Sequence, residues 1–568
     1  MRNDEVAQVF DEVADMLEVS EEANFFRVRA YRNAARAIRD CPRQLADLDA
    51  KALGEIPGIG ADLARKIQTL LETGSLPLHR DLQAKVSPGL LELLRIPGLG
   101  PKRVRLLGER LKIRDAADLK RAAEAGALRT IRGFGEKIEE RILQSLARFQ
   151  AEGVKRLQYA EAEKLADEIL AHLKKSPAVE CVEIAGSFRR RRETVGDLDV
   201  LAISAKPERV VERFLKFPPV RTVLGAGQTK ATVVLSGGLQ VDLRIVPRKS
   251  YGAALIYFTG SKAHGVHIRR VAQDRGLLLN EYGLMRGNKT IAGATEEDVY
   301  RALGLDWMPP EMREDRGEVE AAARHQLPAL LRLEDLRGDL HTHSTWTDGR
   351  ASIEEMAKAA RDAGLEYFAM TDHSRRLAMA HGLDPARLDE QRREIERVAE
   401  RIKGITVLRG IEVDILEDGR LDLPDQTLAQ LDWVVASVHY KLEQNARDMT
   451  RRLIKAIRNR HVDVIGHPSG RLIGRREPSN FDLGEVLRAA RAERCALEVN
   501  SQPARLDLID TACRAAKEAG VKLVIASDAH HPRDFALLKF GVNQARRGWI
   551  EPAEVLNTRP LKSLRQRD

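Results

Sequence analysis

The spacing of hydrophobic residues changes twice along the chain of 568 residues. Residues 1–150 carry apolar positions at helical spacing, interrupted by short Gly and Pro breaks. After one further helix, β-branched runs predict strands at 179–187, 197–204, 230–236 and 239–246. From residue 336 onward, apolar runs alternate with amphipathic helices, which is typical of a parallel α/β domain. The pattern therefore predicts several domains of different fold classes.

Composition narrows the expected location and partners. Lys and Arg (94) exceed Asp and Glu (85), giving a formal net charge of +9, which suits a polyanionic partner without proving one. The four cysteines, Cys41, Cys181, Cys495 and Cys513, have neither CxxC nor disulfide-type spacing. The N-terminus predicts an acidic amphipathic helix instead of a signal peptide, and no run is long enough for a membrane span. We therefore expect a cytoplasmic protein without membrane contact.

One pattern occurs three times in the helical region, at 53–67, 93–107 and 128–143. Each copy has an apolar residue, a turn, Gly-x-Gly and a helix start. Glycines allow close approach to a phosphate, and the helix start offers free N–H groups. The copies resemble helix–hairpin–helix motifs that grip DNA backbone; the alternative is three ordinary turns between helices. The candidate DNA-binding glycines are Gly58, Gly60, Gly98, Gly100, Gly133 and Gly135.

Three aspartates in the predicted sheet suggest a metal site. Alternation along a strand places Asp197 and Asp199 on one face, and Asp242 lies in a second β-rich run. Like charges this close are costly unless a cation lies between them. Three carboxylates suit a pair of Mg²⁺ or Mn²⁺ ions for phosphoryl transfer. The structural alternative is that Asp197 and Asp199 cap a turn.

These residues resemble family X DNA polymerases in order and spacing over about residues 1–315. The matching segments are Gly186-Ser187, Arg189–Arg192, Gly196–Asp199, Asp242 and 257–261. The resemblance implies that the three aspartates bind the metals and that Asp242 helps to deprotonate the primer 3′-hydroxyl. It implies nucleotide contacts from Gly186, Ser187, Arg190, Gly196, Tyr257, Phe258 and Gly260. Lys262 and Gly265 depart from the animal enzymes, and Lys262 is expected to add a phosphate contact.

The first 80 residues resemble the small lyase domain of the same family. Tyr31 matches its substrate-contacting tyrosine, and Lys66 matches its Schiff-base lysine. A lysine can open an abasic sugar when its pKa is lowered. Arg27 and Asp62 replace lysines of the animal enzymes, and a single lysine on a helix surface is more often a solvated charge. Lyase activity is therefore a hypothesis beside a purely structural role.

The C-terminal part concentrates metal-capable side chains at the ends of predicted strands. Nine of the fourteen histidines follow residue 336, and seven apolar runs end near polar residues. Polar groups at the carboxyl ends of parallel strands mark the functional face of a barrel. Mixed imidazole and carboxylate ligands favour Zn²⁺, Mn²⁺ or Fe²⁺. The candidate ligands are His341, His343, Asp348, His373, Glu412, His439, His467, Asp528 and His530.

This set resembles the polymerase-and-histidinol-phosphatase (PHP) domain, a distorted seven-stranded α/β barrel with three metals. The resemblance implies one metal held by His341, His343, Glu412 and Asp528. Glu412 would bridge to a second metal held by His439 and His467. Asp348, His373 and His530 would hold the third.

Together the two resemblances imply a multidomain chain. The expected boundaries are a lyase-like helical domain (1–80), fingers (81–150), an α+β nucleotidyltransferase-type palm (151–248), a thumb (249–315), a linker (316–335) and the PHP domain (336–568). The expected function is gap filling in base excision repair by a bacterial monomer that binds gapped or nicked DNA and dNTP. Its PHP domain would act as a 3′–5′ exonuclease, abasic-site endonuclease or 3′-phosphatase. The alternatives are a small-molecule phosphomonoesterase in the PHP domain and a DNA-binding scaffold without catalysis.

Overall fold

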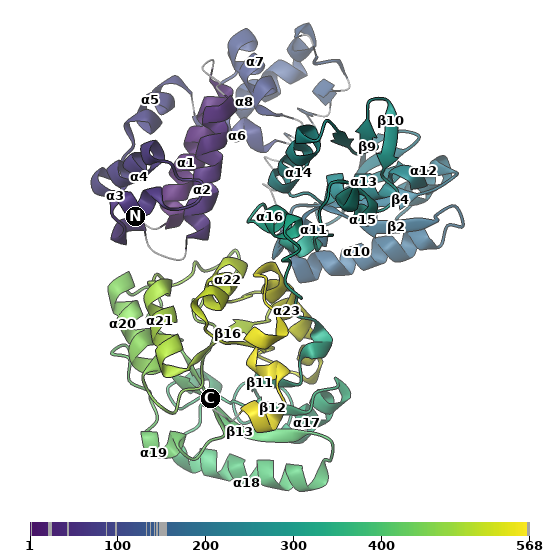
Figure 1. Ribbon diagram of the computed structural model, residues 1–568. Helices are drawn as coiled ribbons and strands as arrows, with labels where there is room; N and C mark the ends of the chain where they lie inside the picture. The colour runs from purple at the N-terminus through teal and green to yellow at the C-terminus, as the bar shows by residue number, and fades with distance from the viewer. Residues whose placement is uncertain are drawn as a thin grey trace. The chain divides into compact units, whose positions relative to one another are not determined.

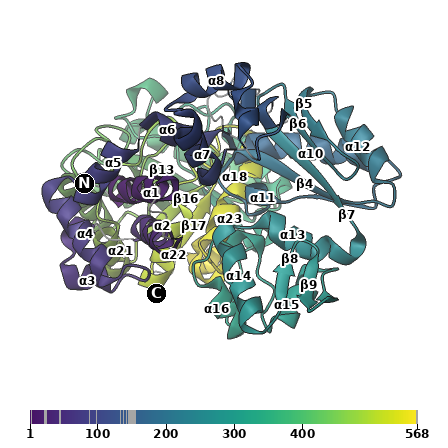
Figure 2. The same cartoon turned by 90° about the horizontal axis from the view of Figure 1, so that it is seen from above.

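The computed structural model describes residues 1, 3–20, 25–41, 45–86, 88–96, 99–131, 133–136, 138–140, 142–143, 146 and 156–564. The chain forms two compact units, residues 1–155 and 156–568. Figures 1 and 2 show the elements of both units.

The regular elements described in the first unit are all helices, as the sequence predicts. Its amphipathic helices bury one shared core, which includes Phe10, Tyr31, Ile67 and Leu107. The helices described in full are α1 (Asn3–Val19), α2 (Phe25–Asp40), α3 (Ala50–Gly54), α4 (Ala61–Thr73), α5 (Pro77–Lys85), α6 (Pro88–Glu92), α7 (Pro101–Leu111) and α8 (Ala116–Glu124).

The Gly-x-Gly turns precede helix starts in this unit. Gly60 and Gly100 are the N-cap residues of α4 and α7, and a glycine has no side chain that could cap the helix start. In the third copy the Gly135 carbonyl accepts hydrogen bonds from the N–H groups of Ile138 and Glu139 at 2.8 and 3.1 Å. The first glycine of this copy, Gly133, has a φ of +97°, which side chains rarely adopt. Gly98 lies outside the described residues.

The second unit begins with a five-stranded sheet in the order β2-β4-β7-β6-β5. Only β4 and β7 are parallel to each other; the other neighbours are antiparallel. Helices α10 and α12 contact this sheet (Figure 2), and alternation along β4 turns Leu198 and Val200 into their shared core. The elements are α10 (Tyr159–Lys174), β2 (Cys181–Ile184), α11 (Gly186–Arg189), β4 (Asp197–Ile203), α12 (Pro207–Leu215), β5 (Val220–Ala226), β6 (Lys230–Leu235) and β7 (Gln240–Val246), with β1 (Leu157–Gln158) paired to β3 (Thr194–Val195).

A smaller α/β part follows the sheet. Its three strands are antiparallel in the order β10-β9-β8. The buried Glu296 at the start of α15 binds Arg189 of the first sheet's domain and Arg313, each at 2.7 Å. The elements are α13 (Tyr251–Thr259), α14 (Lys262–Asp274), β8 (Leu278–Asn280), β9 (Gly283–Arg286), β10 (Lys289–Ala292) and α15 (Glu296–Ala302).

The segment that the sequence suggests as a linker is packed. It contains α16 (Glu318–Ala323), in which Glu318 and Val319 are buried, and Leu331 is fully buried against the C-terminal domain. Glu318 binds the buried His264 at 2.7 Å. The charge and proline content of the segment 316–335 predict an exposed connection, but in the structure Glu318 is buried and paired.

The C-terminal domain is a nearly closed barrel of seven parallel strands in sequential order, β11 to β17. A bridge between Thr342 and Ala529 brings β11 beside β17. The strands are β11 (Gly338–Thr342), β12 (Tyr367–Met370), β13 (Thr406–Asp414), β14 (Trp433–Ser437), β15 (Val464–Ile465), β16 (Ala496–Asn500) and β17 (Leu523–Ala526). All seven strands predicted from the sequence are present.

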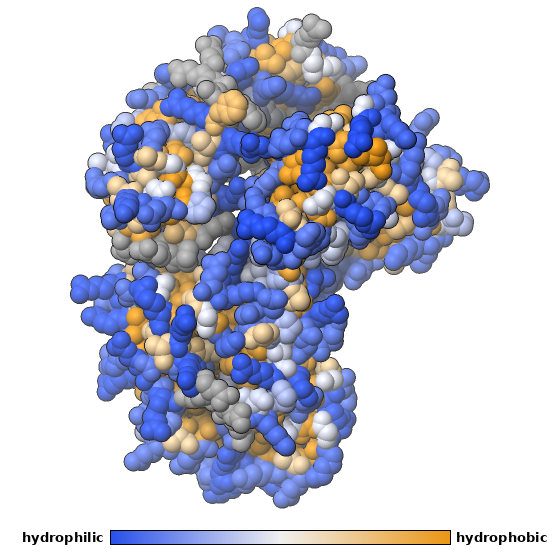
Figure 3. Space-filling view, in the orientation of Figure 1, coloured by the Kyte–Doolittle hydropathy of each residue, from blue (hydrophilic) through white to orange (hydrophobic). Residues whose placement is uncertain are grey.

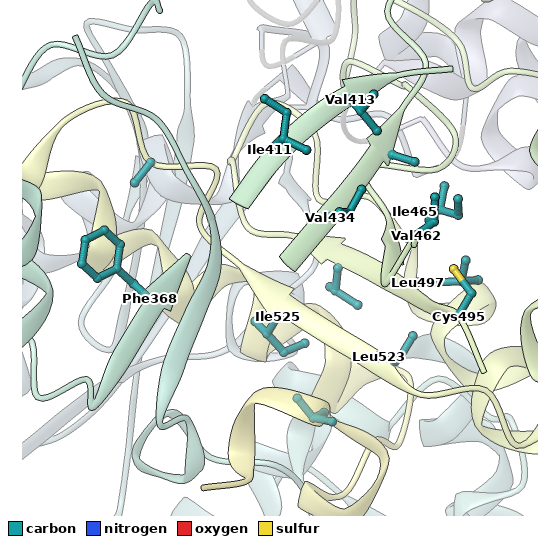
Figure 4. Close-up of a cluster of buried hydrophobic side chains, with 14 of the residues drawn as sticks. Phe368, Ile411, Val413, Val434, Val462, Ile465, Cys495, Leu497, Leu523 and Ile525 are labelled. Carbon is teal, nitrogen blue, oxygen red and sulfur yellow. The ribbon is translucent and has the colours of Figure 1, made fainter. Parts of the chain in front are cut away.

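Helices surround this barrel, as α17 and α18 beside β12 and β13 illustrate (Figure 1). Outward-facing side chains such as Ile411, Val434 and Ile525 form the core between strands and helices (Figure 4). The helices are α17 (Ile353–Asp362), α18 (Pro385–Arg401), α19 (Asp425–Leu428), α20 (Ala446–Ile457), α21 (Leu483–Glu493), α22 (Asp510–Ala519), α23 (Leu538–Arg547) and α24 (Leu561–Leu564).

Hydrophilic residues cover most of the face seen in Figure 3, with hydrophobic residues in patches between them. Among the described residues, no helix has both the length and the apolar character needed to cross a bilayer.

Candidate active sites

The register of two parallel strands brings the predicted carboxylates together. Asp199 on β4 is paired with Asp242 on β7, and Asp197 is paired with Gln240. Asp242 accepts hydrogen bonds from Thr232 and from Gln240 Nε2, the latter at 2.7 Å. Asp197 and Asp199 alternate with apolar residues, so both lie on the face opposite the α10–α12 core.

Asp197 and Asp199 lie close to other negatively charged carboxylates. Burial, followed by the neighbouring charges of Asp197 and Asp242, raises the pKa of Asp199 to about 7. Partial desolvation, followed by the charge of Asp242, also raises the pKa of Asp197, although its side chain is exposed. A divalent cation would remove this repulsion and favour the ionised carboxylates. The residues present therefore fit hard divalent metals.

A cavity of about 330 Å³ opens beside Asp197 and Asp199. Most of the predicted nucleotide-binding residues line it; Gly196 does not, and lies beside Arg156 instead. Arg269 and Asn280 also line the cavity and were not predicted, because neither belongs to a local pattern. The predicted residues that line it are Gly186, Ser187, Arg190, Tyr257, Phe258, Gly260 and Lys262.

Glycine is required at two positions of this cavity. A Cβ at Gly186 would lie 2.4 Å from Asp199 Oδ2, and one at Gly260 would lie 3.2 Å from Arg190 Nη1. Both glycines have positive φ, +65° and +69°. The backbone can therefore approach both the carboxylate and the guanidinium closely.

In the barrel, the nine predicted ligands gather at the carboxyl ends of the strands. Along β13 and β16 the interior changes from apolar residues, Leu408 and Ala496, to the buried Glu412 and Glu498. Three groups have ligand atoms within 4.8 Å of one another among the described residues. They are His343, Asp348, His373 and His530; His341, His343 and Asp528; and His373, Glu412 and His439. In the same described part of the chain, the polymerase carboxylates do not form such a group.

The two oxygens of Glu412 face different histidines. Oε2 lies 3.4 Å from His341 Nε2 and 3.7 Å from His343 Nε2. Oε1 lies 3.3 Å from His439 Nε2 and 3.0 Å from His467 Nε2. His467, absent from the three groups above, thus reaches the cluster through Glu412. Asp348 Oδ2 lies 3.4 Å from His373 Nε2 and 3.3 Å from His530 Nε2.

Within the described part of the chain, several polar atoms of this cluster are buried without a regular hydrogen bond, although His373 Nδ1 and Glu412 Oε2 lie 2.7 Å apart. They include His341 Nε2, both ring nitrogens of His343, His373 Nδ1 and Glu412 Oε2. Leaving such atoms unpaired is costly, whereas metal coordination would satisfy them. The nine residues therefore fit the group of divalent metals that the fold implies.

A second set of buried acids, not among the predicted ligands, supports the histidines from behind. Glu498 Oε1 lies 2.7 Å from His341 Nδ1, and Asp414 Oδ1 lies 3.1 Å from His439 Nδ1. Such contacts fix the ring so that its other nitrogen faces the metal. Their sequence signal is weak: an acid inside an apolar strand, as in the segment 496–501.

The predicted lyase residues are also close together. Lys66 Nζ lies 5.4 Å from the centre of the Tyr31 ring and 2.5 Å from Asp62 Oδ2. Burial lowers the pKa of Lys66, but the hydrogen bond to Asp62 and the nearby Tyr31 outweigh burial and raise the pKa. This environment favours the ammonium form, which cannot attack an aldehyde.

Four family models match the chain. They are a helix-hairpin-helix domain (1–76), a SAM-like helix-hairpin-helix tandem (90–148), the DNA polymerase beta thumb (254–314) and the PHP domain (339–502).

Relatives match either the whole chain or its C-terminal part. The DNA polymerase/3′-5′ exonuclease PolX of Bacillus subtilis (strain 168) is 38% identical over 568 residues, 99% of each chain. A probable phosphatase of Thermoanaerobacter sp. (strain X514) is 33% identical over 232 residues, 39% of this chain and 89% of that protein. A probable phosphatase of Photobacterium profundum is 34% identical over 209 residues, 34% of this chain and 79% of that protein.

Fold and sites together define a nucleotidyltransferase-type enzyme with an added metal-dependent hydrolase domain. The chain belongs to the family X DNA polymerases that carry a C-terminal PHP domain.

Proposed function

We propose that this protein fills short gaps in DNA during repair and that its PHP domain hydrolyses phosphoesters at DNA ends. The main support for synthesis is the register of Asp199 with Asp242 beside the cavity that Ser187 and Arg190 line. Membership of the family and the full-length match to a DNA polymerase/3′-5′ exonuclease support both halves.

For synthesis, Asp197, Asp199 and Asp242 would hold Mg²⁺ or Mn²⁺. Such ions neutralise the triphosphate and lower the pKa of an attacking hydroxyl. Asp242, which accepts hydrogen bonds from Thr232 and Gln240, would accept the proton of the primer 3′-hydroxyl. Arg190 and Ser187 would donate hydrogen bonds to the triphosphate.

The remaining lining residues would select and orient the nucleotide. Tyr257 and Phe258 at the end of α13 would pack under the sugar, with Gly260 keeping the backbone close. Lys262 begins α14 at the cavity and would add a phosphate contact. The helix–hairpin–helix turns at Gly60 and Gly100 would hold backbone phosphates of gapped or nicked DNA through uncapped N–H groups.

For hydrolysis, Glu412 would join two metals, one held with His341, His343 and Asp528 and one with His439 and His467. Asp348, His373 and His530 would hold the third. Bound Zn²⁺, Mn²⁺ or Fe²⁺ would supply an activated water and neutralise the phosphate. Glu498 and Asp414 would orient their histidines.

The surroundings of the cluster favour DNA over a small monoester. A cavity of about 590 Å³ beside Asp348, Asp528 and His530 is also lined by Arg350, Arg505, Arg533 and His531. Several cations beyond the metal ligands suit a chain of phosphates. A phosphomonoesterase remains the second candidate, because probable phosphatases match the PHP part.

Paired variants of the full chain test both sites. D197A/D199A should abolish extension on gapped duplex with Mg²⁺ and spare removal of 3′-terminal nucleotides with Mn²⁺; H341A/H343A should do the reverse. Loss of both activities in a folded double variant would contradict two separate sites. Faster turnover of histidinol phosphate than of DNA ends would favour the phosphomonoesterase.

A further inference from the structure

One arginine of the PHP domain contacts the nucleotide-binding segment of the polymerase part. Arg547, at the end of α23, is buried, with 3% of its side chain exposed. Its Nη1 donates to the carbonyl oxygen of Arg190 at 2.8 Å and to Glu314 Oε1 at 3.1 Å. Its Nη2 donates to Asp510 Oδ2 of the barrel at 2.6 Å. Arg547 thus links the barrel to the backbone of Arg190.

The same Glu314 oxygen also holds the side chain of Arg190. Arg190 Nε donates to Glu314 Oε1 at 3.1 Å, and Nη1 donates to the carbonyl of Thr259. Within the described part of the chain Nη2 has no protein partner, and Arg190 lines the nucleotide cavity. One edge of the guanidinium is therefore fixed, and the other is left for a ligand.

Arg190 and Arg547 share one carboxylate. Burial raises the pKa of Glu314, but Arg547 and Arg190, followed by Arg192 and Arg316, lower it to about 2, so it is ionised at neutral pH. Without Arg547, Glu314 would direct more of its charge to Arg190 and compete with a triphosphate for the guanidinium. The Arg190 carbonyl would also lose a donor, and the turn after α11 would lose a fixed point.

We propose that Arg547 and Glu314 are positioning residues for Arg190, through which the PHP domain sets the affinity of the polymerase site for the triphosphate of dNTP. This inference depends on the proposed contact of Arg190 with the triphosphate.

Single-nucleotide insertion on a one-nucleotide gap, measured with the full chain, tests the inference. Arg547→Ala should raise the KM for dNTP roughly tenfold, the scale of one charge-assisted hydrogen bond. kcat and the affinity for gapped DNA should change less than about twofold. The inhibition constant of inorganic tripolyphosphate, which has no base or sugar, should rise in parallel. A loss of folding alone would not split KM from kcat in this way.

A matched control lies on the same helix. Lys539 of α23 binds Glu163 of α10 at 2.6 Å, across the same contact between palm and barrel, without touching Arg190. Lys539→Ala should leave the KM for dNTP unchanged. An equal rise of KM in both variants would overturn the inference, because any loosening of the contact would then have the same effect.

A conservative variant guards against unfolding of Arg547→Ala. Arg547→Lys keeps a buried cation for Asp510 and Glu314, but its single ammonium cannot reproduce the forked contacts. Its KM should rise by a smaller factor, about threefold on the same scale. Unchanged KM and tripolyphosphate inhibition in this variant, with unchanged thermal unfolding, would overturn the inference. Arg190→Ala distinguishes failure of the proposed triphosphate contact from failure of the positioning role. An unchanged KM for dNTP in Arg190→Ala would refute the triphosphate contact of Arg190 itself.

Discussion

Gly186 illustrates at the scale of one residue how the polymerase carboxylates depend on a missing side chain. Gly186→Ala would place a Cβ 2.4 Å from Asp199 Oδ2 in a backbone with φ +65°. We expect extension to fall about a hundredfold, because a shift of about 1 Å in a reacting group has this effect. Gly227→Ala, whose Cβ would meet its nearest atom at 3.8 Å, should be harmless. The measurement is the primer-extension rate of each variant, and unchanged hydrolysis by the PHP domain shows that the variant is folded. Equal extension rates for the two variants would contradict the prediction.

Asp62 makes a second prediction about a single residue. Because Asp62 helps to raise the pKa of Lys66, Asp62→Ala should lower that pKa and populate the neutral amine at lower pH. Borohydride trapping of an abasic-site complex should then reach its plateau at lower pH than in the original protein. Glu72→Ala, on the same helix and bonded to Gln68, is the control. Absence of any complex that depends on Lys66 would refute the lyase hypothesis.

Single residues were predictable where chemistry repeats in the sequence. The nine candidate ligands of the barrel stand out because they lie at or just past the ends of apolar runs, and the structure brings all nine to one end. Glu498 and Asp414 could not be identified, because an acid inside an apolar strand gives no sign of which histidine it meets. The raised pKa of Lys66 depends on how close Asp62 and Tyr31 lie, which no spacing specifies.

At the scale of elements, α15 joins the thumb to the palm through Glu296. Burial opposes ionisation, but Arg313 and Arg189 lower the pKa of Glu296 far below 4.5. A carboxyl group with a lowered pKa stabilises the folded state when the pH is above the ordinary pKa of that group. This stabilisation is lost progressively as the pH falls below about 4.5.

Glu296→Gln should therefore destabilise the protein by about 3 kcal/mol at neutral pH, since it removes the charge shared by the buried Arg313 and the largely buried Arg189. The difference from the original protein should shrink in acid. Thermal unfolding at pH 7 and pH 4 measures both effects. Asp298→Asn, on the same helix but in an exposed pair with Arg301, should cost less than about 1 kcal/mol. A similar loss in both variants would show that burial of the pair is irrelevant.

Strand β16 carries the next prediction. Glu498→Gln keeps the shape of the side chain but removes the charge that orients His341. Metal affinity, measured by competition with a chelator, should fall about 10- to 100-fold. The exposed Glu493→Gln at the end of α21 should leave affinity unchanged. Unchanged metal affinity in Glu498→Gln would contradict the proposal that Glu498 orients His341 for metal binding.

The strands of the barrel were predictable because each apolar run is bounded and alternates with a helix. In the palm, β5 was not predicted, since its residues are mostly exposed and carry no apolar pattern. The charge of the segment 316–335 predicts a linker, yet Glu318 is buried with His264. Local sequence cannot distinguish a solvated charge from one whose partner lies far along the chain.

At the scale of the whole molecule, palm, thumb and barrel belong to one compact unit. The barrel holds buried nitrogens that metals would satisfy. Heating the protein without metal, and assaying hydrolysis after metal is restored, should therefore give a lower temperature of half-inactivation than heating with metal bound. The temperature of half-inactivation of extension, assayed after Mg²⁺ is restored, should fall as well. Independent inactivation of the two activities would contradict a shared unfolding unit.

The buried arginine contacts of α23 also bear on how such a chain can be divided during evolution. A gene ending after residue 315 would encode Glu311 and Glu314 without Arg546 and Arg547, their partners from the barrel. A gene starting after it would leave Arg546 and Arg547 without those acids. Relatives that match the barrel alone are therefore expected to have replaced these two arginines. An alignment of the probable phosphatases at the end of α23 would show whether other residues stand at positions 546 and 547 in proteins without the polymerase part.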